Sequence, residues 1–346
     1  MRRRDGGIGR HKGLKIPRQF NLPCQFDSGS RQTAGSLKNS GCFFFRGFKM
    51  FSDTHFHFHY LVENNSQEFG TEILEQMAKN RIYFGLDIGT KCSDLIERAQ
   101  ILEDCLEEIP DVNLQSKLKK SIFFSAGIWP DPDSIKERKA CIEELRDSIE
   151  DFKESSSSFS SHLAAIGEGG IDHHWNPSGP DGRSESDFDK EMFFGEKELF
   201  EMQLELAKEL DLPFIVHSRE GFEDTVDVLR AANYNRGIIH CFSYGLNEAK
   251  TFLDLGWHLA FGGATTYTKK AKMDELIELL RYVPKDRILL ETDSPYLAPV
   301  PMRGSENNPL LIKYTYEFIS EKIGLSVDKL NKIVDDNCSE LFRLKK

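Results

Sequence analysis

The sequence of 346 residues lacks the long apolar run of a membrane-spanning helix, since no stretch approaches about 18 uninterrupted hydrophobic residues. It also lacks any Cys-x-x-Cys pair among its seven cysteines. That pattern argues against a zinc ribbon and against a secreted disulfide scaffold. Reduced, intracellular thiols are the simplest interpretation, and we expect a cytoplasmic protein with no membrane association and no obligate protein partner.

Positive charge is scarce as well. The formal net charge of −11 argues against a general basic coat for DNA. It leaves a nuclease possible, because the phosphate contacts of such an enzyme can be local and borne by metal ions. With 39% hydrophobic and 29% charged residues, the chain has enough apolar material for a large core, which excludes a disordered or fibrous protein.

The first 49 residues differ from the rest, holding 11 Lys/Arg but two Asp/Glu, a balance of +9. They show neither a helical nor a strand period, and they lack the apolar core of a secretory signal. Organellar targeting peptides are basic and poor in acidic residues in the same way. Met50 directly precedes the first patterned segment, so a disordered tail or a start-site artefact fits equally well. We therefore predict a basic, disordered leader over 1–49 and a folded domain over 50–346, with organellar or nuclear localisation left open.

From Met50 onward, short apolar runs alternate with longer amphipathic segments, as expected for strands and helices. The predicted strands are Phe51–His55, Ile82–Leu86, Ile122–Gly127, Leu163–Gly167, Phe214–His217, Ile238–Cys241, His258–Phe261 and Ile288–Glu291. The predicted helices are Asp94–Ile109, Ile135–Phe152, Glu196–Leu210, Phe222–Ala232, Leu246–Leu255, Met273–Tyr282, Pro309–Ile323 and Val327–Phe342. This alternation predicts an α/β fold, a (β/α)₈ TIM barrel. A doubly wound open sheet is the rival, but no glycine-rich phosphate turn follows the first strand.

Two insertions interrupt the alternation. The serine run Ser155–Ser161 joins a helix to the next strand, and helix-to-strand loops lie at the bottom of a barrel, so we interpret it as a slack linker. Trp175–Lys190 follows the fourth strand and therefore belongs to the top, where barrel active sites lie. Its composition predicts an irregular loop, either a lid or a solvated excursion.

The strongest local signal is His55-Phe56-His57. Positions i and i+2 of a strand share a face, so both imidazoles can point at one metal ion. The other candidate ligands also fall where predicted strands end, which is where barrel active sites converge. These are Glu168 on the fourth strand, His217 on the fifth, His240 on the sixth and Asp293 after the eighth. That such residues end five different strands favours a shared metal centre over a set of unrelated polar residues.

These residues lie in strings that resemble the TatD family of metal-dependent deoxyribonucleases, from about Met50 to the C-terminus. The strings are His55–His57, Gly167–Asp172, Phe214–Glu220, His240–Ser243 and Glu291–Pro299. Of these, Glu-Thr-Asp-Ser-Pro-Tyr at 291–296 is the most specific. The resemblance implies a TIM-barrel hydrolase with a two-metal site that hydrolyses DNA phosphodiester bonds, often from a 3′ end.

Carried over residue by residue, the resemblance suggests two metal sites that share one bridging ligand. It places His55, His57 and Asp293 on one metal, His217 and His240 on the other, and Glu168 between them. Carboxylate and imidazole ligands suit two divalent ions, Mg²⁺, Mn²⁺ or Zn²⁺. We hypothesise that Asp293 also accepts the proton of the attacking water. Arg219 is a candidate phosphate contact, although an ion pair with a nearby carboxylate explains it equally well.

The sequence departs from the family pattern in three places. Trp129 stands where relatives usually carry a histidine, which puts any substrate contact there in doubt. The pair Gly169-Gly170 can soften the turn that aims Glu168. His173-His174 and the following loop replace a shorter aromatic stretch. We expect His59, His173 and His174 to be bystanders, because they exceed the ligand count.

The alternative function is a metal-dependent amide or ester hydrolase, including one that cleaves the aminoacyl ester on tRNA. Many amidohydrolases bridge their metals with a modified lysine on the fourth strand, but Leu163–Asp172 contains no lysine. A third class, a non-catalytic binding protein on a decayed barrel, is disfavoured by the complete set of ligands. We therefore expect a DNA substrate.

Overall fold

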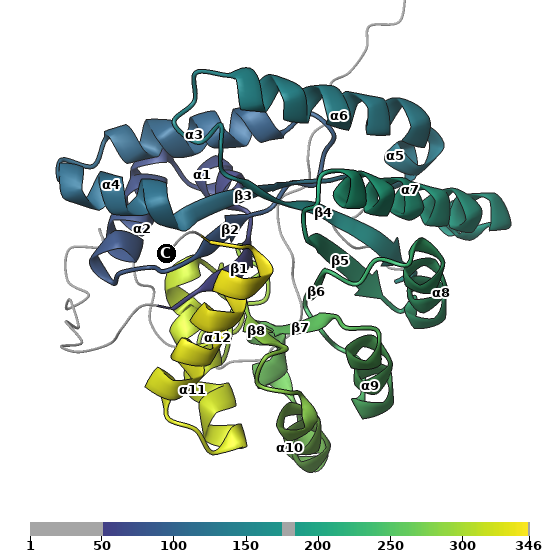
Figure 1. Cartoon of the computed structure of the whole chain (residues 1–346). Helices are drawn as coiled ribbons and strands as arrows, with labels where there is room; N and C mark the ends of the chain where they lie inside the picture. Colours follow the sequence, from purple (N-terminus) through teal and green to yellow (C-terminus); the bar gives the residue numbers. More distant parts are fainter. Residues whose placement is uncertain (1–50, 175–183, 345–346) are drawn as a thin grey trace, which may run out of the picture. The chain divides into compact units, whose positions relative to one another are not determined.

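The computed structural model describes residues 51–174 and 184–344, so the predicted leader and much of the 175–190 loop lie outside the described residues. Eight parallel strands form one sheet in the order β1 to β8, with helices around it (Figure 1). The strands are β1 Asp53–Phe56, β2 Gly85–Asp87, β3 Ile122–Ala126, β4 Leu163–Asp172, β5 Phe214–Arg219, β6 Gly237–Ile239, β7 His258–Phe261 and β8 Ile288–Leu290.

The barrel closes where the ends of β1 and β8 meet. The amide N of Asp293 donates to the carbonyl O of His55 at 2.8 Å, and that of His57 donates to Ser294 at 2.8 Å. These bonds bring segments more than 230 residues apart side by side. The predicted (β/α)₈ barrel is confirmed.

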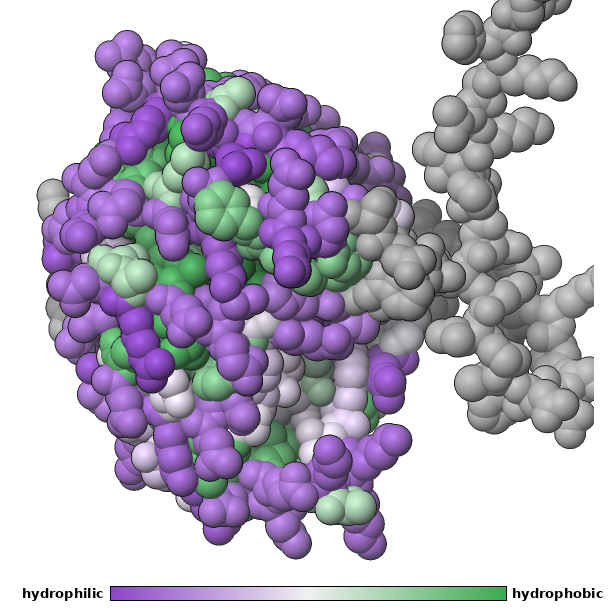
Figure 2. All heavy atoms as spheres, turned by 90° about the vertical axis from the view of Figure 1, so that its right-hand side faces the viewer, coloured by the Kyte–Doolittle hydropathy of each residue, from purple (hydrophilic) through white to green (hydrophobic). Residues whose placement is uncertain are grey.

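The helices pack around the sheet, and their outer faces are polar. On the side formed by α7, α8 and α9, hydrophobic side chains show mainly in gaps between hydrophilic ones (Figure 2). The α-helices are α1 Phe58–Asn64, α2 Gln67–Lys79, α3 Leu95–Glu107, α4 Val112–Ser121, α5 Pro132–Lys136, α6 Arg138–Glu154, α7 Lys190–Glu209, α8 Phe222–Ala232, α9 Leu246–Asp254, α10 Met273–Tyr282, α11 Ile312–Ile323 and α12 Val327–Leu341. Four short 3₁₀ segments are described as well: η1 Glu185–Phe188, η2 Gly263–Tyr267, η3 Lys270–Lys272 and η4 Pro309–Leu311. No described helix has both the length and the apolarity to cross a membrane.

The strands are buried on both faces, as a parallel sheet covered by helices requires. All four residues of β1 and of β7 are buried, although Asp53, Thr54 and His55 are polar. A polar residue inside a barrel must find partners, and Asp53 accepts hydrogen bonds from Thr292, from its Oγ1 at 2.7 Å and its amide N at 2.9 Å. Asp53 therefore links β1 to the segment after β8 inside the barrel.

Strand β4 differs from the prediction, because it continues past Glu168 to Asp172. From Gly167 to Gly169, β4 advances by two residues while its partner β5 advances by only one. The extra residue, Glu168, therefore forms a bulge. The glycine pair does not form a loose turn: Gly170 has φ +147°, and a Cβ there would lie 2.0 Å from the carbonyl O of His217. Close approach of the two backbones requires glycine at this position.

The serine run Ser155–Ser161 is not a slack linker, which corrects that prediction. Ser158 donates to Glu103 Oε1 from its amide N at 2.7 Å and from its hydroxyl at 2.6 Å. Phe159 is fully buried and its ring lies edge-on to Phe124 of β3, with centroids 5.4 Å apart. One aromatic residue therefore anchors the run to the core.

Candidate metal centre

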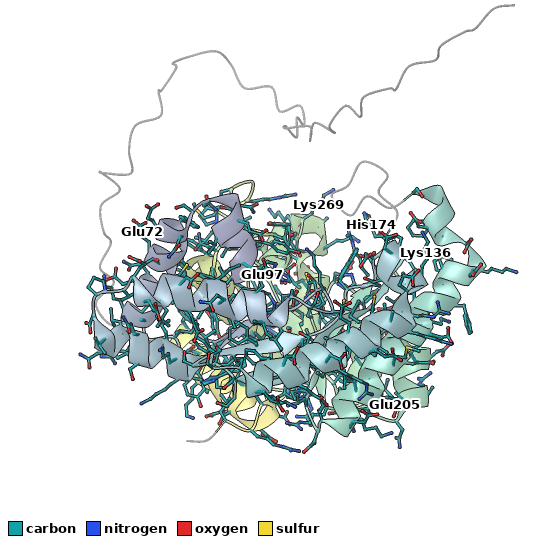
Figure 3. All side chains as sticks on the ribbon, turned by 90° about the horizontal axis from the view of Figure 1, so that it is seen from above. Glu72, Glu97, Lys136, His174, Glu205 and Lys269 are labelled. Atoms are coloured by element: carbon teal, nitrogen blue, oxygen red, sulfur yellow. The ribbon has the colours of Figure 1, made fainter. Side chains whose placement is uncertain are left out.

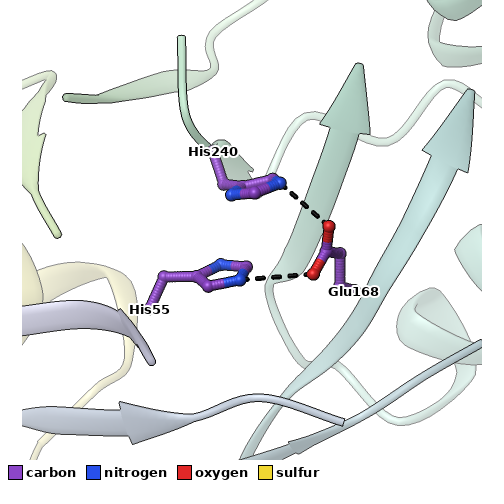
Figure 4. A group of neighbouring side chains, drawn as sticks. All are labelled: His55, Glu168 and His240. Atoms are coloured by element: carbon purple, nitrogen blue, oxygen red, sulfur yellow. Dashed lines mark ion pairs between the residues drawn. The ribbon is translucent and has the colours of Figure 1, made fainter. Parts of the chain in front are cut away.

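The six predicted ligands meet at the C-terminal ends of the strands, around the carboxylate of Glu168. Its Oε1 lies 2.7 Å from His217 Nδ1 and 2.9 Å from His240 Nε2. Its Oε2 lies 3.2 Å from His55 Nε2 and 3.9 Å from His57 Nε2. Figure 4 shows His55 and His240 facing the two oxygens, with their rings stacked at a centroid distance of 4.1 Å. Each oxygen of one carboxylate thus faces its own group of imidazoles.

Asp293 joins the group that faces Oε2. Its Oδ1 lies 3.6 Å from His55 Nε2 and 3.7 Å from His57 Nε2. Its backbone has φ 57°, a left-handed conformation that is uncommon for non-glycine residues and clusters at functional sites. With His217, it has the most exposed side chain of the six, at 13% and 14%. Those two positions mark the open side of the site.

Burial works against charge on Glu168, but the positive charges of His240 and His55, with hydrogen bonds from His217 and His240, hold its pKa well below the ordinary value. Burial likewise opposes ionisation of Asp293, yet a hydrogen bond from His57 and the charge of His55 lower its pKa. Both carboxylates are therefore ionised at neutral pH, as metal ligands must be.

The histidines fall into two electrostatic classes. Although burial pulls in the opposite direction, Asp172 and Glu168 raise the pKa of His217 to about 9, and Glu168 and Glu291 raise that of His240 well above the ordinary value. Burial and the charge of His240 lower the pKa of His55. Each group thus contains ionised carboxylate next to imidazole, the donor set of a divalent cation site.

Outer hydrogen-bond partners orient two of these imidazoles, those of His217 and His57, as is usual for histidines that bind metal. His217 Nε2 donates to Asp172 Oδ2 at 3.0 Å, which turns Nδ1 toward Glu168. His240 Nδ1 lies 3.7 Å from Glu291 Oε1. His57 Nδ1 donates to the carbonyl O of Ile88 at 3.2 Å, leaving Nε2 available to a metal. Among the described residues, neither His240 Nδ1 nor His55 Nδ1 has a hydrogen-bond partner.

Asp172 and Glu291 were missed as functional residues, although both lie within the strings that carry the family resemblance. A signal was present in each case. Asp172 lies an even number of residues beyond Glu168 on the same strand, and Glu291 lies two residues before Asp293. Strand periodicity alone could therefore have placed Asp172 on the same face as Glu168, and Glu291 on the same face as Asp293. This would have required longer predicted strands.

A buried ion cluster holds the loop between β2 and α3 against the site. Arg98, which is fully buried, donates to Asp94 Oδ1 at 2.9 Å and to the carbonyl O of Ser125 at 2.6 Å, and it also pairs with Asp87. The loop offers the carbonyl O of Gly89 to the amide N of Glu168 at 2.9 Å. This cluster therefore helps to fix the residue at the centre of the site.

The structure places Arg219 and Trp129 at the edge of the site. The Arg219 side chain is 46% exposed, and its guanidinium lies 3.9 Å from Asp172 Oδ2. This is the ion pair with a carboxylate that the sequence offered as an alternative to a phosphate contact. The Trp129 ring lies edge-on to His217 with centroids 5.8 Å apart. Both side chains are thus next to the open side of the group that faces Oε1.

The surplus histidines have partners away from the carboxylate oxygens of Glu168. His173 Nε2 lies 3.1 Å from Glu196 Oε2, and His174 Nδ1 lies 2.6 Å from Glu220 Oε1. His59 is buried with its ring 3.8 Å from that of Tyr60, and burial lowers its pKa to about 2. Their role as bystanders stays a prediction.

Two trios of ligand atoms lie close enough together to hold a metal ion. They are His55, Glu168 and His240, and His55, His57 and Asp293. The residues therefore fit a divalent cation, on the chemistry of their donors and on the ionised state of both carboxylates.

Comparison with known proteins identifies the family of this chain. The family described as TatD related DNase matches residues 52–343. The uncharacterized metal-dependent hydrolase YabD of Bacillus subtilis is 37% identical over 184 residues, which cover 53% of this chain and 66% of that protein, just under two thirds of its length. The uncharacterized metal-dependent hydrolase YcfH of Escherichia coli K12 is 31% identical over 233 residues, 65% of this chain and 76% of that protein.

Solved structures share the fold. YJJV, a TatD homologue from Escherichia coli K12, superposes with a TM-score of 0.63 at 22% identity, covering 85% of this chain and 98% of that one. A TatD family hydrolase from Entamoeba histolytica gives 0.65 at 17% identity, covering 86% and 99%. Fold, site and relatives define a metal-dependent hydrolase built on a TIM barrel. The chain belongs to the TatD family.

Proposed function

We propose that the protein is a metal-dependent deoxyribonuclease that hydrolyses DNA phosphodiester bonds from a 3′ end, using two divalent ions. One observation carries the proposal: the two oxygens of Glu168 face separate groups of ligands, His217 and His240 on one side and His55, His57 and Asp293 on the other. A shared carboxylate between two donor groups is the arrangement that two-metal phosphodiester hydrolysis requires.

In this proposal His55, His57 and Asp293 hold one ion, His217 and His240 hold the other, and Glu168 bridges them. When bound, the pair would polarise a phosphate oxygen and lower the pKa of a water molecule toward about 7. Mg²⁺, Mn²⁺ and Zn²⁺ all suit these donors.

The chain itself supplies the proton acceptor and the positioning. Asp293 is ionised at neutral pH and partly exposed, so its carboxylate can accept a proton from a water molecule at the open side. The exposed guanidinium of Arg219 can hold a phosphate oxygen through two parallel hydrogen bonds, at the cost of its long contact with Asp172.

An amide or ester hydrolase, including one that cleaves an aminoacyl ester on tRNA, is the second candidate, because the same donors would polarise a carbonyl oxygen. It is disfavoured by β4, whose ten residues Leu163–Asp172 contain no lysine to serve as a modified bridge. Glu168 is the charged residue of β4 that lies between the two ligand groups.

The test is an assay of metal-reconstituted protein on end-labelled single- and double-stranded DNA, beside a panel of amide and ester substrates. We expect stepwise shortening from the 3′ end that stops when a chelator is added. Cleavage of amides in preference to DNA would favour the second candidate, and chelator-insensitive cleavage would contradict both.

A further inference from the structure

We infer that the loops after β7 and β8 form a binding surface for a single DNA strand that leads its end into the metal centre. This inference rests on the proposed nuclease function and names the part of the chain that holds the substrate beyond the reacting phosphate. We call this region the β7–β8 surface, and it consists of Tyr267, Lys269, Lys270, Lys272, Tyr296 and Arg303.

The first argument is charge. Residues 262–272 contain three lysines and no acidic residue, in a chain whose net charge is −11. Lys269, Lys270 and Lys272 are exposed, and none of them forms an ion pair with another described residue. Some lysines elsewhere are neutralised, as Lys79 is by Glu75 at 2.7 Å. Unpaired cations gathered in one place on an acidic protein favour a polyanionic ligand.

The second argument is the exposure of apolar side chains on the neighbouring loop. Tyr296 is 47% exposed, and Leu297, Val300 and Met302 are exposed within the same seven residues. Aromatic rings beside cations are the combination that binds single strands, because bases stack on the rings while phosphates contact the cations. A duplex could not offer its bases in this way, so the surface fits a single strand.

The third argument is continuity with the metal centre. The Tyr296 ring lies edge-on to His57 with centroids 6.1 Å apart. The Tyr267 hydroxyl donates to the carbonyl O of Ala298 at 2.6 Å, and the Arg303 guanidinium lies 4.2 Å above the Tyr267 ring. These contacts connect the loop of Tyr296, beside a proposed metal ligand, to Tyr267 and Arg303, and Lys269 follows Tyr267 by two residues in the chain.

Close packing holds the two loops together. The amide N of Val300 donates to Thr266 Oγ1 at 2.9 Å, and a Cβ on Gly263 would lie 2.0 Å from the carbonyl O of Leu297. Lys269 and His174, which follow β7 and β4, both lie along the edge of the barrel where the β-strands end (Figure 3). A preformed surface at this edge can hold a strand without first being ordered.

The test uses a triple variant, Lys269→Gln with Lys270→Gln and Lys272→Gln. It compares a substrate long enough to contact these lysines with one that is not. One substrate is a long single-stranded oligonucleotide, and the other is bis(p-nitrophenyl) phosphate, which is too small to reach the lysines from the metal centre. We expect the KM for the oligonucleotide to rise by about tenfold or more and to depend less steeply on salt, because three phosphate contacts are lost. Turnover at saturation and hydrolysis of the small diester should change less than twofold.

The matched control is a triple variant of α4, Lys117→Gln with Lys119→Gln and Lys120→Gln, which also removes three lysines within four residues. That helix leads into the opposite end of the barrel, so the KM for the oligonucleotide should stay within twofold.

Three results would count against the inference. An unchanged KM in the first triple variant, an equal rise in both triple variants, or a matching loss on the small diester would each contradict the β7–β8 surface. A parent protein that hydrolyses the small diester but neither binds nor cleaves DNA would instead contradict the proposed function itself.

Discussion

The two sides of the Glu168 carboxylate are built differently. On the Oε1 side, each histidine lies against a second carboxylate: His217 contacts Asp172 at 3.0 Å, and His240 lies 3.7 Å from Glu291. On the Oε2 side, His57 is held by a backbone carbonyl, and His55 has no outer partner among the described residues.

This difference indicates which side of the carboxylate is suited to accepting the proton. Carboxylates behind His217 and His240 raise the basicity of those imidazoles and fix their orientation, which favours tight and stable binding. The Oε2 side instead contains Asp293, an ionised and partly exposed carboxylate that can exchange protons with solvent. We therefore expect the Oε1 side to anchor its ion and the Oε2 side to carry the proton acceptor.

The largest effect should come from Glu168→Gln, which abolishes the charge that both sides share. Metal content should fall below two equivalents, and cleavage should drop by more than the roughly hundredfold that an outer partner is worth. Mass spectrometry of metal content beside a nuclease assay measures both. Asp335→Asn, a variant of a partly buried carboxylate, is the control and should keep its metals, since Asp335 contacts Ser52 instead. Near-normal cleavage by Glu168→Gln would refute the shared bridge.

Asp293→Asn should separate the two sides. It weakens the Oε2 site and removes the proton acceptor, while Glu168, His217 and His240 remain. The variant should retain at least one metal equivalent and bind DNA, yet lose at least about a hundredfold in turnover, the lower range for a positioned base. Binding is measured by fluorescence anisotropy and turnover by single-turnover cleavage. Turnover close to that of the parent would show that another group accepts the proton.

Metal loading on the two sides should depend differently on pH. The raised pKa of His217, about 9, means that this imidazole carries a proton at pH 7 that a metal must displace. Affinity at the Oε1 side should therefore rise with pH, by about tenfold per unit up to pH 9 for one displaced proton. On the Oε2 side, burial lowers the pKa of His55, while the hydrogen bond to Asp293 raises that of His57 in spite of burial. The pKa values of His217 and His240 are both raised, so a metal on the Oε2 side displaces fewer protons and that side gains less. Titration with Mn²⁺ at pH 7, 8 and 9 checks this, and equal pH dependence of both sites would remove the distinction.

Asp172→Asn should weaken the Oε1 side alone. Removal of an outer carboxylate typically costs about 10- to 100-fold in metal affinity or activity. The control is Asp224→Asn, whose carboxylate pairs with Lys197 and not with a ligand. Competition with a metal-sensitive dye reports the affinity of each site. A loss spread evenly over both sites would mean that Asp172 supports the barrel and not His217 in particular.

The smallest effect belongs to His174→Ala. His174 pairs with Glu220 and lies outside both ligand groups. Cleavage should therefore change by less than about tenfold, which corresponds to roughly 1.4 kcal/mol in the activation barrier. Metal stoichiometry should be unchanged. A lost metal equivalent would show that the ligand assignment omits this residue.

Sequence periodicity was sufficient for the eight strands, since each is a short apolar run between turns. Among the described residues it missed four helices, α1, α2, α4 and the five-residue α5, Pro132–Lys136. Helix α1 has seven residues and begins directly after His57, which leaves too little sequence for a helical period. Helix α4 buries Leu114 and Leu118 alone, a pair too sparse to stand out. By contrast, α2 has a capping residue, Ser66, and buried residues at helical spacing, so it could have been found.

The residues of the candidate site could be named from the sequence, but the contacts that support them could not. Glycines are unfavourable in strands, so Gly169 and Gly170 indicated a loop, whereas the close approach of β5 requires Gly170 inside β4, and Gly169 lies against Gln203. Because that strand was predicted to end at Gly167, Asp172 was not identified as part of the site. The contact between Glu168 and Gly89 joins β4 to the loop after β2 through backbone atoms alone, and side-chain patterns do not report such contacts.

The most direct test of the two-sided site is a crystal structure of the Mn²⁺-loaded protein with anomalous diffraction data. We predict two anomalous peaks about 3.5–4 Å apart with Glu168 between them. One should lie against His217 and His240, and the other against His55, His57 and Asp293. A single peak, or two peaks that do not share Glu168, would contradict the account.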